Sequence, residues 1–332
     1  MAPAVIVLLA AYPVVVAILS MVNLVAPQRN GPLAITQVAA PHLWLGVLVL
    51  VPLMRFTPSR VLRVGIAAAL ALGALRFGPG LISIGQAVDD SGDSFLIVAS
   101  WNLEAGSGTS GDLIDLLRST DASVVALQEL TPDDAAAIEA STAVTARFPY
   151  AALEPRPGVT GLGILSRVPV LDASMSLDPA VLEALLELPG GEAFTVINAH
   201  PFPPRYQVLP ALRVPLDYNA SDRDADLMEI HDRVMDAIGS TAQRVVLIGD
   251  FNVTDREPGY EDLATGLWDA HREVGQGPGS TWRPSRLEFL PFGILRIDYV
   301  FGGPGTRPLV MREDCAARFS DHCVISATVA VD

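Results

Sequence analysis

Charge is distributed so unevenly along this chain that it limits the possible fold more than any other sequence feature. The first acidic residue is Asp89, and the segment before it carries five Arg, no acid and no Lys. All 37 acidic residues and the other 17 Arg follow, so the rest of the chain has a formal net charge of −20. We therefore predict a membrane anchor over residues 1–80, a linker over residues 81–94 and a globular domain over residues 95–332.

Three apolar segments predict about three transmembrane helices. Residues 4–22 are uncharged and match the roughly 20 residues that a bilayer requires. A cleaved signal peptide is the alternative for this segment, although no basic residue precedes it. The second segment covers residues 33–54. The third covers residues 58–77, and its Arg side chains must reach the two membrane surfaces.

The Arg residues between these segments predict the orientation of the chain. Arg55, Arg60 and Arg63 lie between the second and third segments, whereas Arg29 alone lies between the first and second. Because positively charged loops stay in the cytoplasm, we expect the globular domain outside the cell membrane after three crossings. If the third segment only lay on the membrane surface, the domain would be cytoplasmic instead.

The two cysteines, Cys315 and Cys323, leave two alternatives open. They are too few for a disulfide-built scaffold and have no partners at the spacing of a zinc site. They are either buried thiols or, in an oxidising compartment, a disulfide. Seven residues lie between them, including Ser320-Asp321-His322, so a disulfide would close a short loop and restrain that segment.

The globular part alternates between short β-rich runs and helical stretches, which predicts a layered α and β domain. Runs rich in Val and Ile predict buried strands at 95–101, 123–127, 163–165, 195–198, 245–248 and 296–300. The stretches between them predict helices at 111–119, 132–143, 222–238 and 260–273.

Polar residues that burial does not explain follow or begin six of these segments. Strand ends on one edge of a sheet are where a rigid scaffold can direct several side chains at one point. Each residue also has a purely structural interpretation, such as a turn asparagine, a solvated carboxylate or a loop histidine. The segments are Trp101-Asn102-Leu103-Glu104, Leu127-Gln128-Glu129, Asn198-Ala199-His200, Ile248-Gly249-Asp250-Phe251-Asn252, Ile297-Asp298-Tyr299 and Ser320-Asp321-His322.

In this order, the segments SWNLE, ALQEL, GLGILSRVP, NAHPF, IGDFN, RIDYVF and SDH resemble the endonuclease/exonuclease/phosphatase superfamily, which is also called DNase I-like. The resemblance covers residues 95–331. It implies a four-layer αββα sandwich with one active site at the strand ends. The apolar segments ahead of it resemble bacterial members that carry this domain behind membrane helices.

The resemblance also implies a metal site. Glu129 would be the main ligand of a divalent cation, assisted by Asn102 and Asp321. Carboxylate and amide oxygens suit the hard cation Mg²⁺, with Mn²⁺ as the alternative. Such a cation would neutralise phosphoryl oxygens and make its bound water more acidic.

The same resemblance assigns the catalytic groups. Asp250 would orient or deprotonate the attacking water, and Asn252 would hold phosphoryl oxygens. Asp298 would pair with His322, and His200 would be a second donor to the phosphate. The sequence around His200 differs from the Tyr-containing motif of the abasic-site endonucleases and is similar to the DNase, sphingomyelinase and phosphatase branches.

Three functions are compatible with this pattern, and charge ranks them. The leading one is hydrolysis of a lipid-borne or envelope phosphate, because an acidic domain without Lys repels a long polyanion, whereas a few local donors can bind one phosphate. An extracytoplasmic nuclease is the runner-up, and Arg205, Arg283 and Arg296 could form a basic patch for it. A silent binding module is the third. The predicted partners are thus the bilayer and a phosphorylated lipid, with nucleic acid disfavoured.

Overall fold

The computed structural model describes residues 3–55, 60–81, 94–105, 107–209, 214–240, 244–287, 289–316 and 320–331. The chain forms two compact units. The first comprises Met1–Ile82 with two later segments, Pro204–Ser221 and Arg256–Pro258. The second comprises Ser83–Pro203, Asp222–Asp255 and Gly259–Asp332. Most of the predicted linker lies outside the described residues, and the predicted domain boundaries stay a prediction.

The first unit is mainly helical. Its elements are α1 (Pro3–Val25), α2 (Pro32–Val38), α3 (Ala40–Leu50), the 3₁₀ helix η1 (Val51–Arg55), α4 (Arg60–Leu81) and a hairpin of β8 (Arg205–Leu209) and β9 (Val214–Asn219). Val16, Val47 and Ile66 form the centre of its apolar core. The hairpin joins α2 because the Gly31 N–H donates to the Tyr218 carbonyl at 2.7 Å.

Among the described residues, one helix is long and apolar enough to cross a membrane, at Arg60–Gly78 within α4. The second predicted segment forms α2 and α3, which bend by 68° at their junction and qualify only as one broken span. In the first segment, the side chains of α1 are described without interruption over Ala11–Val25, and this apolar stretch is shorter than a span. Length and composition therefore support one crossing, and the further crossings stay a prediction.

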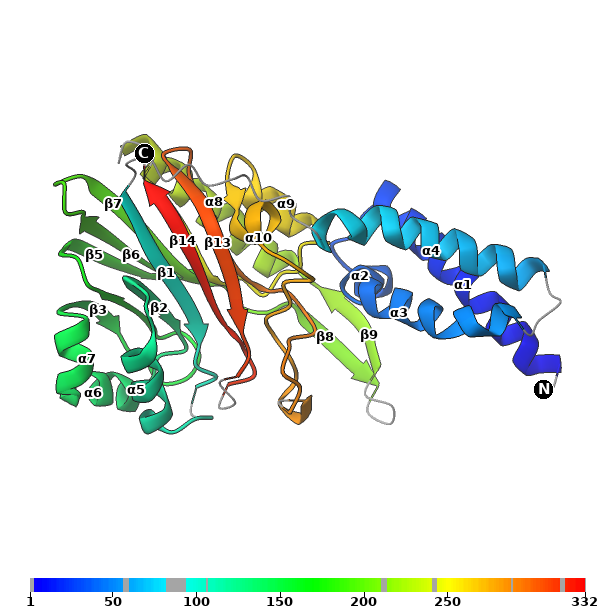
Figure 1. Ribbon diagram of the computed structural model, residues 1–332, viewed down its shortest axis with the longest axis horizontal. Helices are drawn as coiled ribbons and strands as arrows, with labels where there is room; N and C mark the ends of the chain where they lie inside the picture. Colours follow the sequence, from blue (N-terminus) through cyan, green and yellow to red (C-terminus); the bar gives the residue numbers. More distant parts are fainter. Residues whose placement is uncertain are drawn as a thin grey trace. The chain divides into compact units, whose positions relative to one another are not determined.

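The second unit contains two six-stranded sheets (Figure 1). In spatial order, the first sheet consists of β13 (Thr306–Asp314), β14 (Val324–Val331), β1 (Ser94–Asn102), β2 (Val124–Gln128), β4 (Leu162–Ser166) and β3 (Tyr150–Glu154). The second consists of β11 (Trp268–Asp269), β12 (Asp298–Gly302), β10 (Val245–Asp250), β7 (Ala193–His200), β6 (Ala180–Glu187) and β5 (Val170–Leu177). β1 and β2 are parallel, as are β7 and β10.

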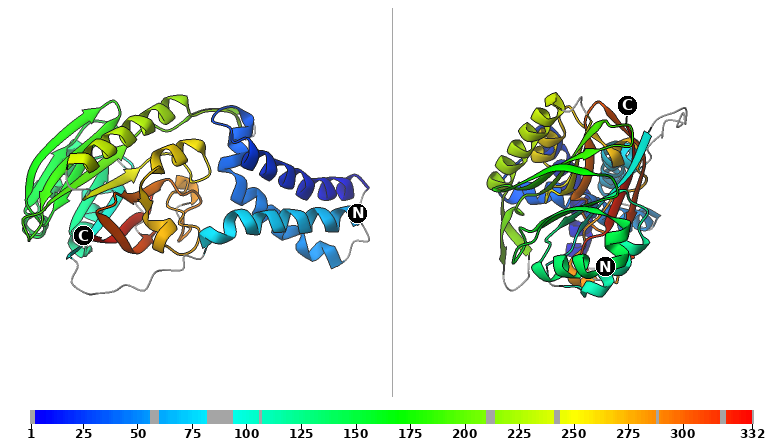
Figure 2. Two further views of the ribbon diagram at one scale, coloured as in Figure 1. Left: turned by 90° about the horizontal axis from the view of Figure 1, so that it is seen from above. Right: turned by 90° about the vertical axis from the view of Figure 1, so that its left-hand side faces the viewer.

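The sheets pack face to face, and helices cover their outer faces (Figure 2). In β1, Val98 points into the core between the sheets, whereas the next residue, Ala99, packs against the helix layer. Both faces of the central strands are thus buried, which explains their continuous apolar runs. The helices are α5 (Ser110–Ser119), α6 (Pro132–Ala140), α7 (Thr142–Arg147), α8 (Ser221–Ser240), α9 (Pro258–Ala264) and α10 (Ala270–Val274). The predicted four-layer αββα sandwich is confirmed.

Two predicted helices are each divided in the structure. The first breaks at Ser141, whose side chain accepts from the Val144 N–H and so begins α7 as a new N-cap. The second breaks between α9 and α10, where Asp269 lies in the short strand β11 and caps α10 through the His271 and Arg272 N–H groups. Local capping residues therefore override what reads as one continuous helical stretch.

Candidate active site

Strand register brings the predicted polar residues to one edge of both sheets. Asn102 ends β1 opposite Gln128 at the end of the parallel strand β2. In the other sheet, Asp250 ends β10 directly opposite Asp298 at the start of β12. His200 ends β7, the parallel neighbour of β10. The two sheets thus contribute facing halves of a single polar cluster.

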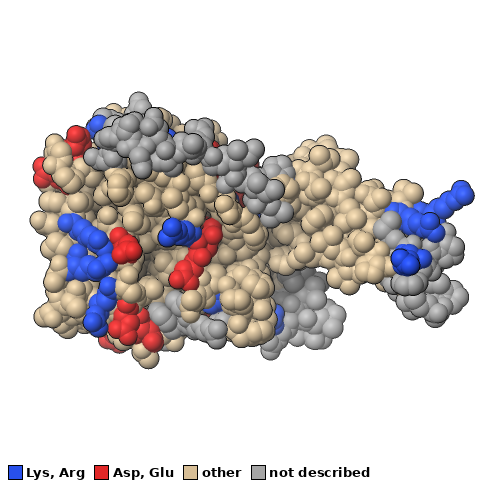
Figure 3. Space-filling view, in the orientation of Figure 1, with Lys and Arg blue, Asp and Glu red and all other residues tan. Residues whose placement is uncertain are grey.

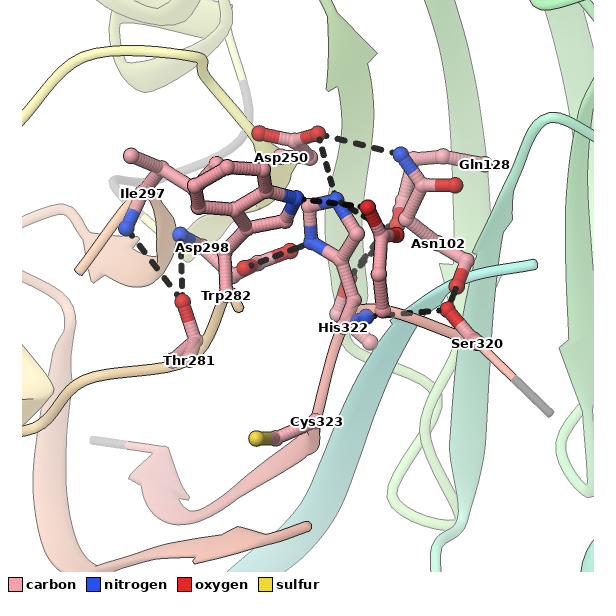
Figure 4. A network of polar contacts seen from close by, with 12 residues as sticks. Asn102, Gln128, Asp250, Thr281, Trp282, Ile297, Asp298, Ser320, His322 and Cys323 are labelled. Carbon is pink, nitrogen blue, oxygen red and sulfur yellow. Dashed lines mark hydrogen bonds and ion pairs between the residues drawn. The ribbon is translucent and has the colours of Figure 1, made fainter. Parts of the chain in front are cut away.

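Asp250 lies at the centre of this cluster and is 1 % exposed (Figure 4). One carboxylate oxygen, Oδ2, accepts from Asn102 Nδ2 at 3.0 Å and lies 3.5 Å from His200 Nε2 and 3.6 Å from His322 Nε2. The other, Oδ1, accepts from the Asn252 backbone N–H at 2.9 Å. Burial raises the pKa of Asp250, but the charges and hydrogen bonds of the two histidines outweigh it and lower the pKa overall.

His322 pairs with Asp298 as predicted from the resemblance. Its Nδ1 lies 3.1 and 3.0 Å from the two Asp298 oxygens, and the Asp298 N–H donates to Thr281 Oγ1 at 3.2 Å. Burial alone would lower the pKa of His322, but Asp298 and then Asp250 raise it to about 10. The imidazole is therefore a cation at neutral pH, with Nε2 directed at Asp250.

His200 approaches Asp250 from β7, the neighbouring strand of the same sheet. Its Nδ1 lies 3.0 Å from the Val159 carbonyl, which fixes a proton on that nitrogen. Burial lowers the pKa of His200, but the hydrogen bond and charge of Asp250, together with the charge of Glu129, raise it overall. His200 and His322 thus present two Nε2 donors to the same carboxylate.

Asn102 connects Asp250 with Glu129. Its Nδ2 donates to Glu129 Oε1 at 3.1 Å as well as to Asp250, whereas its Oδ1 accepts from the Glu104 N–H at 2.9 Å. The second Glu129 oxygen accepts from the Ala105 N–H at 2.9 Å. In this arrangement, the amide nitrogen of Asn102, and not its oxygen, faces the two carboxylates.

Backbone conformation at the site is unusual. Three non-glycine residues have positive φ among the described residues, Glu104 at 49°, Glu129 at 57° and Asn252 at 52°, and all three lie here. Such conformations cost on the order of 1–3 kcal/mol each, and they cluster at functional sites. Gly249, before Asp250, has a φ of 148°, and a Cβ there would lie 2.1 Å from the Ala199 carbonyl oxygen. The motif IGDFN therefore requires its glycine.

The loop after β13 supplies Asp321 and His322. The Asp321 N–H donates to Glu104 Oε2 at 3.0 Å, and Trp282 Nε1 donates to Asp321 Oδ2 at 2.8 Å. Burial raises the pKa of Asp321 to about 6, with His322 opposing it and Glu104 adding to it. Ser320 anchors the loop to the first sheet through the Asn102 carbonyl at 2.7 Å.

Of the two alternatives that the sequence left open for the cysteines, the structure has the disulfide. Cys315 and Cys323 are bonded and close the loop that carries Asp321 and His322. Arg283 lies behind this loop, fully buried, with its guanidinium donating to Cys323 Sγ at 3.4 Å and to the Cys315 carbonyl at 3.3 Å. Arg283 is therefore not exposed, as a member of the basic patch considered from the sequence would have to be.

The cluster has the charge and donor chemistry of a cation site. It contains two histidines and five carboxylates, those of Glu104, Glu129, Asp250, Asp298 and Asp321. All of these except Glu104 lie within 4.0 Å of a histidine nitrogen. With every carboxylate ionised and both imidazoles charged, the formal excess is three negative charges in a largely buried place, which favours a bound cation. One set of ligand atoms within 4.8 Å of one another belongs to Asp250, Asp298 and His322. The predicted set of Glu129, Asn102 and Asp321 stays a prediction.

Several neighbouring residues were not predicted. Glu104 and Ser320 belong to the motifs SWNLE and SDH, so the sequence indicated that they lie near the site but did not predict their hydrogen bonds. Thr281 and Trp282 lie in a loop without strand pattern, and nothing local in the sequence relates them to Asp298 or Asp321. Asn198 is not part of the site. It is buried between the sheets, where its Nδ2 donates to the Leu127 and Gly163 carbonyls at 2.9 and 3.0 Å.

Comparison with known proteins agrees with this geometry. The model of the Endonuclease/Exonuclease/phosphatase family matches residues 99–322. No curated protein sequence matches the chain.

Solved structures share the fold of the second unit. A functionally unknown conserved protein from Enterococcus faecalis has a TM-score of 0.55 and 20 % identity over 71 % of this chain and 100 % of its own. The 3′ phosphatase NExo from Neisseria, bound to a product DNA hairpin, has a TM-score of 0.54 and 21 % identity over 70 % and 98 %. Truncated TDP2 from Caenorhabditis elegans has a TM-score of 0.52 and 16 % identity over 72 % and 98 %. At these identities the likeness concerns the fold alone.

Proposed function

Because the chain belongs to the endonuclease/exonuclease/phosphatase family, we propose that it is a divalent-cation-dependent phosphoric ester hydrolase acting on a lipid-borne phosphate. The observation that carries the proposal is the buried carboxylate of Asp250 between the Nε2 atoms of His200 and His322. A site of this kind provides a base for water and two donors for phosphoryl oxygens.

In the proposed reaction, water attacks phosphorus directly and the P–O ester bond breaks on the opposite side. Asp250, held ionised by its neighbours, accepts the proton of the attacking water. The charged His322, and His200, whose pKa is also raised, donate to the phosphoryl oxygens as negative charge develops there. Asn252, whose Nδ2 is fixed on the Pro201 carbonyl at 3.1 Å, lies next to these oxygens in our proposal.

A divalent cation, Mg²⁺ or Mn²⁺, fits the excess negative charge of the cluster. In this proposal Glu129, Asn102 and Asp321 would hold it, because Asp250 and the charged His322 have other roles in the reaction. When bound, it would neutralise charge on the phosphate and polarise the P–O bond.

Charge supports the proposed substrate class. The chain from Asp89 onward carries −20 and has no Lys. Two of the three Arg that could have formed a basic patch are buried and engaged elsewhere, Arg283 by the disulfide and Arg296 by Asp269 and Asp255. On the face shown in Figure 3, Arg side chains of the second unit stand beside acidic ones. A single phosphate can be bound by the site alone, whereas an extended polyanion requires more cations.

The location is also a proposal. Helix α4 is apolar enough to cross a membrane, and an anchored site meets lipid headgroups at high effective concentration. Arg60 and Arg63 begin this helix, which favours that end in the cytoplasm and the catalytic unit outside. A disulfide between Cys315 and Cys323 is compatible with an extracytoplasmic location, where thiols are oxidised.

A nuclease is the second candidate function. It is favoured by the structural neighbours, since NExo is described as bound to a product DNA hairpin. The two functions differ in the substrate that the same site accepts.

The test compares lipid phosphates in detergent with duplex and hairpin DNA, using the purified full chain with Mg²⁺ at low salt. Lipid turnover is expected, and Asp250→Asn and Glu129→Gln should lower it by several orders of magnitude, on the order of 10³-fold or more. Glu139→Gln is the matched control, because Glu139 is exposed on α6 and should retain activity. Efficient DNA cleavage without lipid turnover would make the nuclease correct. Turnover of neither would refute the proposed hydrolase.

A further inference from the structure

The described residues 284–287 and 289–294 belong to a loop that is fixed to the rim of the active site; we call them the rim loop. Its two ends are joined by backbone hydrogen bonds between Trp282 and Leu295 at 2.9 Å and between Ile294 and Trp282 at 2.7 Å. The same Trp282 donates to the Asp321 carboxylate, and Ser285 Oγ, inside the loop, donates to Glu104 Oε1 at 3.2 Å. Hydrogen bonds therefore connect the base of the loop directly to Asp321 and Glu104 of the site.

The tip of the rim loop is apolar and exposed. Phe289 is 66 % exposed and Phe292 is 55 % exposed, and Pro291 between them is also exposed. Figure 1 shows this orange segment, which carries the 3₁₀ helix η2 (Ser285–Leu287), projecting beyond the end of the sheets at which β1 terminates. Two large aromatic side chains at one projecting tip indicate a binding surface rather than a packing defect.

We propose that the rim loop inserts Phe289 and Phe292 into the surface of a lipid bilayer and thereby seats the active site over the phosphate headgroups. The placement of the active site over a lipid phosphate rests on the proposed function, whereas insertion of the loop can be tested independently of it.

Composition supports a bilayer as the occupant. Phe289, Leu290, Pro291 and Phe292 form an uncharged apolar run for the acyl boundary. The loop's two charged residues, Arg286 and Glu288, precede this run, and the exposed Arg286 can contact headgroup phosphates. The chain itself also contains a helix apolar enough to cross a membrane, α4, so a bilayer is a surface that this chain is built to meet. A lipid phosphate lies at headgroup depth, and a loop that penetrates roughly 5–10 Å holds a site at that level.

Insertion of the loop can be measured by fluorescence quenching, which does not require hydrolysis of any substrate. The full chain is reconstituted in vesicles of phosphatidylcholine and phosphatidylglycerol, and Trp is introduced as Phe289→Trp or Phe292→Trp. Brominated acyl chains should quench the added fluorescence of both variants. Phe95→Trp is the matched control, since Phe95 is 64 % exposed at the start of β1, the end of the strand away from the site, and its added fluorescence should be unquenched. Equal quenching at Phe95, or none at either loop position, overturns the proposal.

A second measurement links the loop to substrate. The double variant Phe289→Ser/Phe292→Ser should lower hydrolysis of a bilayer-embedded lipid phosphate by about tenfold or more. Its hydrolysis of soluble bis(p-nitrophenyl) phosphate should match the wild type, as should both activities of Phe95→Ser. Quenching of the loop variants without wild-type lipid turnover supports insertion and overturns the proposed substrate. Unchanged lipid turnover by the double variant, without quenching, overturns insertion and leaves a protein partner as the occupant.

Discussion

The disulfide between Cys315 and Cys323 should stabilise the catalytic unit by a measurable amount. It joins residues separated by 8 positions in sequence. Closing a loop of that length removes chain entropy from the unfolded state, and the loop-entropy relation gives about 2.5 kcal/mol at 25 °C. Reduction deletes no atoms, so it isolates this contribution better than substitution does.

The assay is denaturant unfolding of the full chain in detergent, followed by tryptophan fluorescence, with and without dithiothreitol. The free energy of unfolding should fall by about 2.5 kcal/mol on reduction. Cys315→Ala should lie at the reduced value and should not respond to dithiothreitol. Activity should fall by about tenfold rather than vanish, because Asp298 and Ser320 still hold His322 and its loop. Equal stability of the oxidised and reduced protein, or two free thiols by mass spectrometry of unreduced protein, would refute this reasoning.

Three further predictions follow from the site. Chelation of divalent cations should abolish turnover, and added Mg²⁺ or Mn²⁺ should restore it; full activity in excess chelator would contradict the proposed cation. Because the pKa of His322 is raised to about 10, above its ordinary 6.5, its contribution to stability is present below about pH 6.5 and lost as pH rises through about 10. For the chelated protein, the free energy of unfolding measured by denaturation should fall as pH rises across that range, and Asp298→Asn should reduce this pH dependence. Gly249→Ala should destabilise by about 3 kcal/mol in denaturant unfolding, because its Cβ would strike the Ala199 carbonyl, whereas Gly239→Ala, with open space around it, should not.

The central strands were predictable from sequence because both of their faces are buried. A continuous run of Val, Ile and Leu, as in β10, has no helical period and is too short for a buried helix. β6 was not predicted, since its sequence AVLEALLE consists of good helix formers. There, pairing with β5 and β7 on both sides decides the conformation, and no local propensity reports that.

The site was predictable to the extent that its residues end strands. Asp250 and His200 follow apolar runs whose parallel register can be anticipated, so their convergence follows from the fold. The contacts of Trp282 and Thr281 could not be anticipated, because these residues reach the site from a loop whose path depends on tertiary packing. The conformation of Asn102, with its amide nitrogen toward the carboxylates, likewise depends on the Glu104 N–H.

The net charge of the domain disfavours nucleic acid as a substrate, but from the sequence alone a few Arg could still have formed a basic patch near the site. The structure shows that two of these Arg are buried. Arg296 is 3 % exposed and forms ion pairs with Asp269 and Asp255. Arg283 donates hydrogen bonds to the Cys315 carbonyl and the Cys323 sulfur. The basic side chains within the described cluster are His200 and His322, and both face Asp250. In the proposed site the charged His322, the donor His200 and a divalent cation would suffice for one phosphate, whereas a duplex offers about one negative charge per 1.7 Å of its axis. In our proposal, recognition beyond the single phosphate therefore comes from apolar contact, which the described rim of the site provides at Phe289 and Phe292.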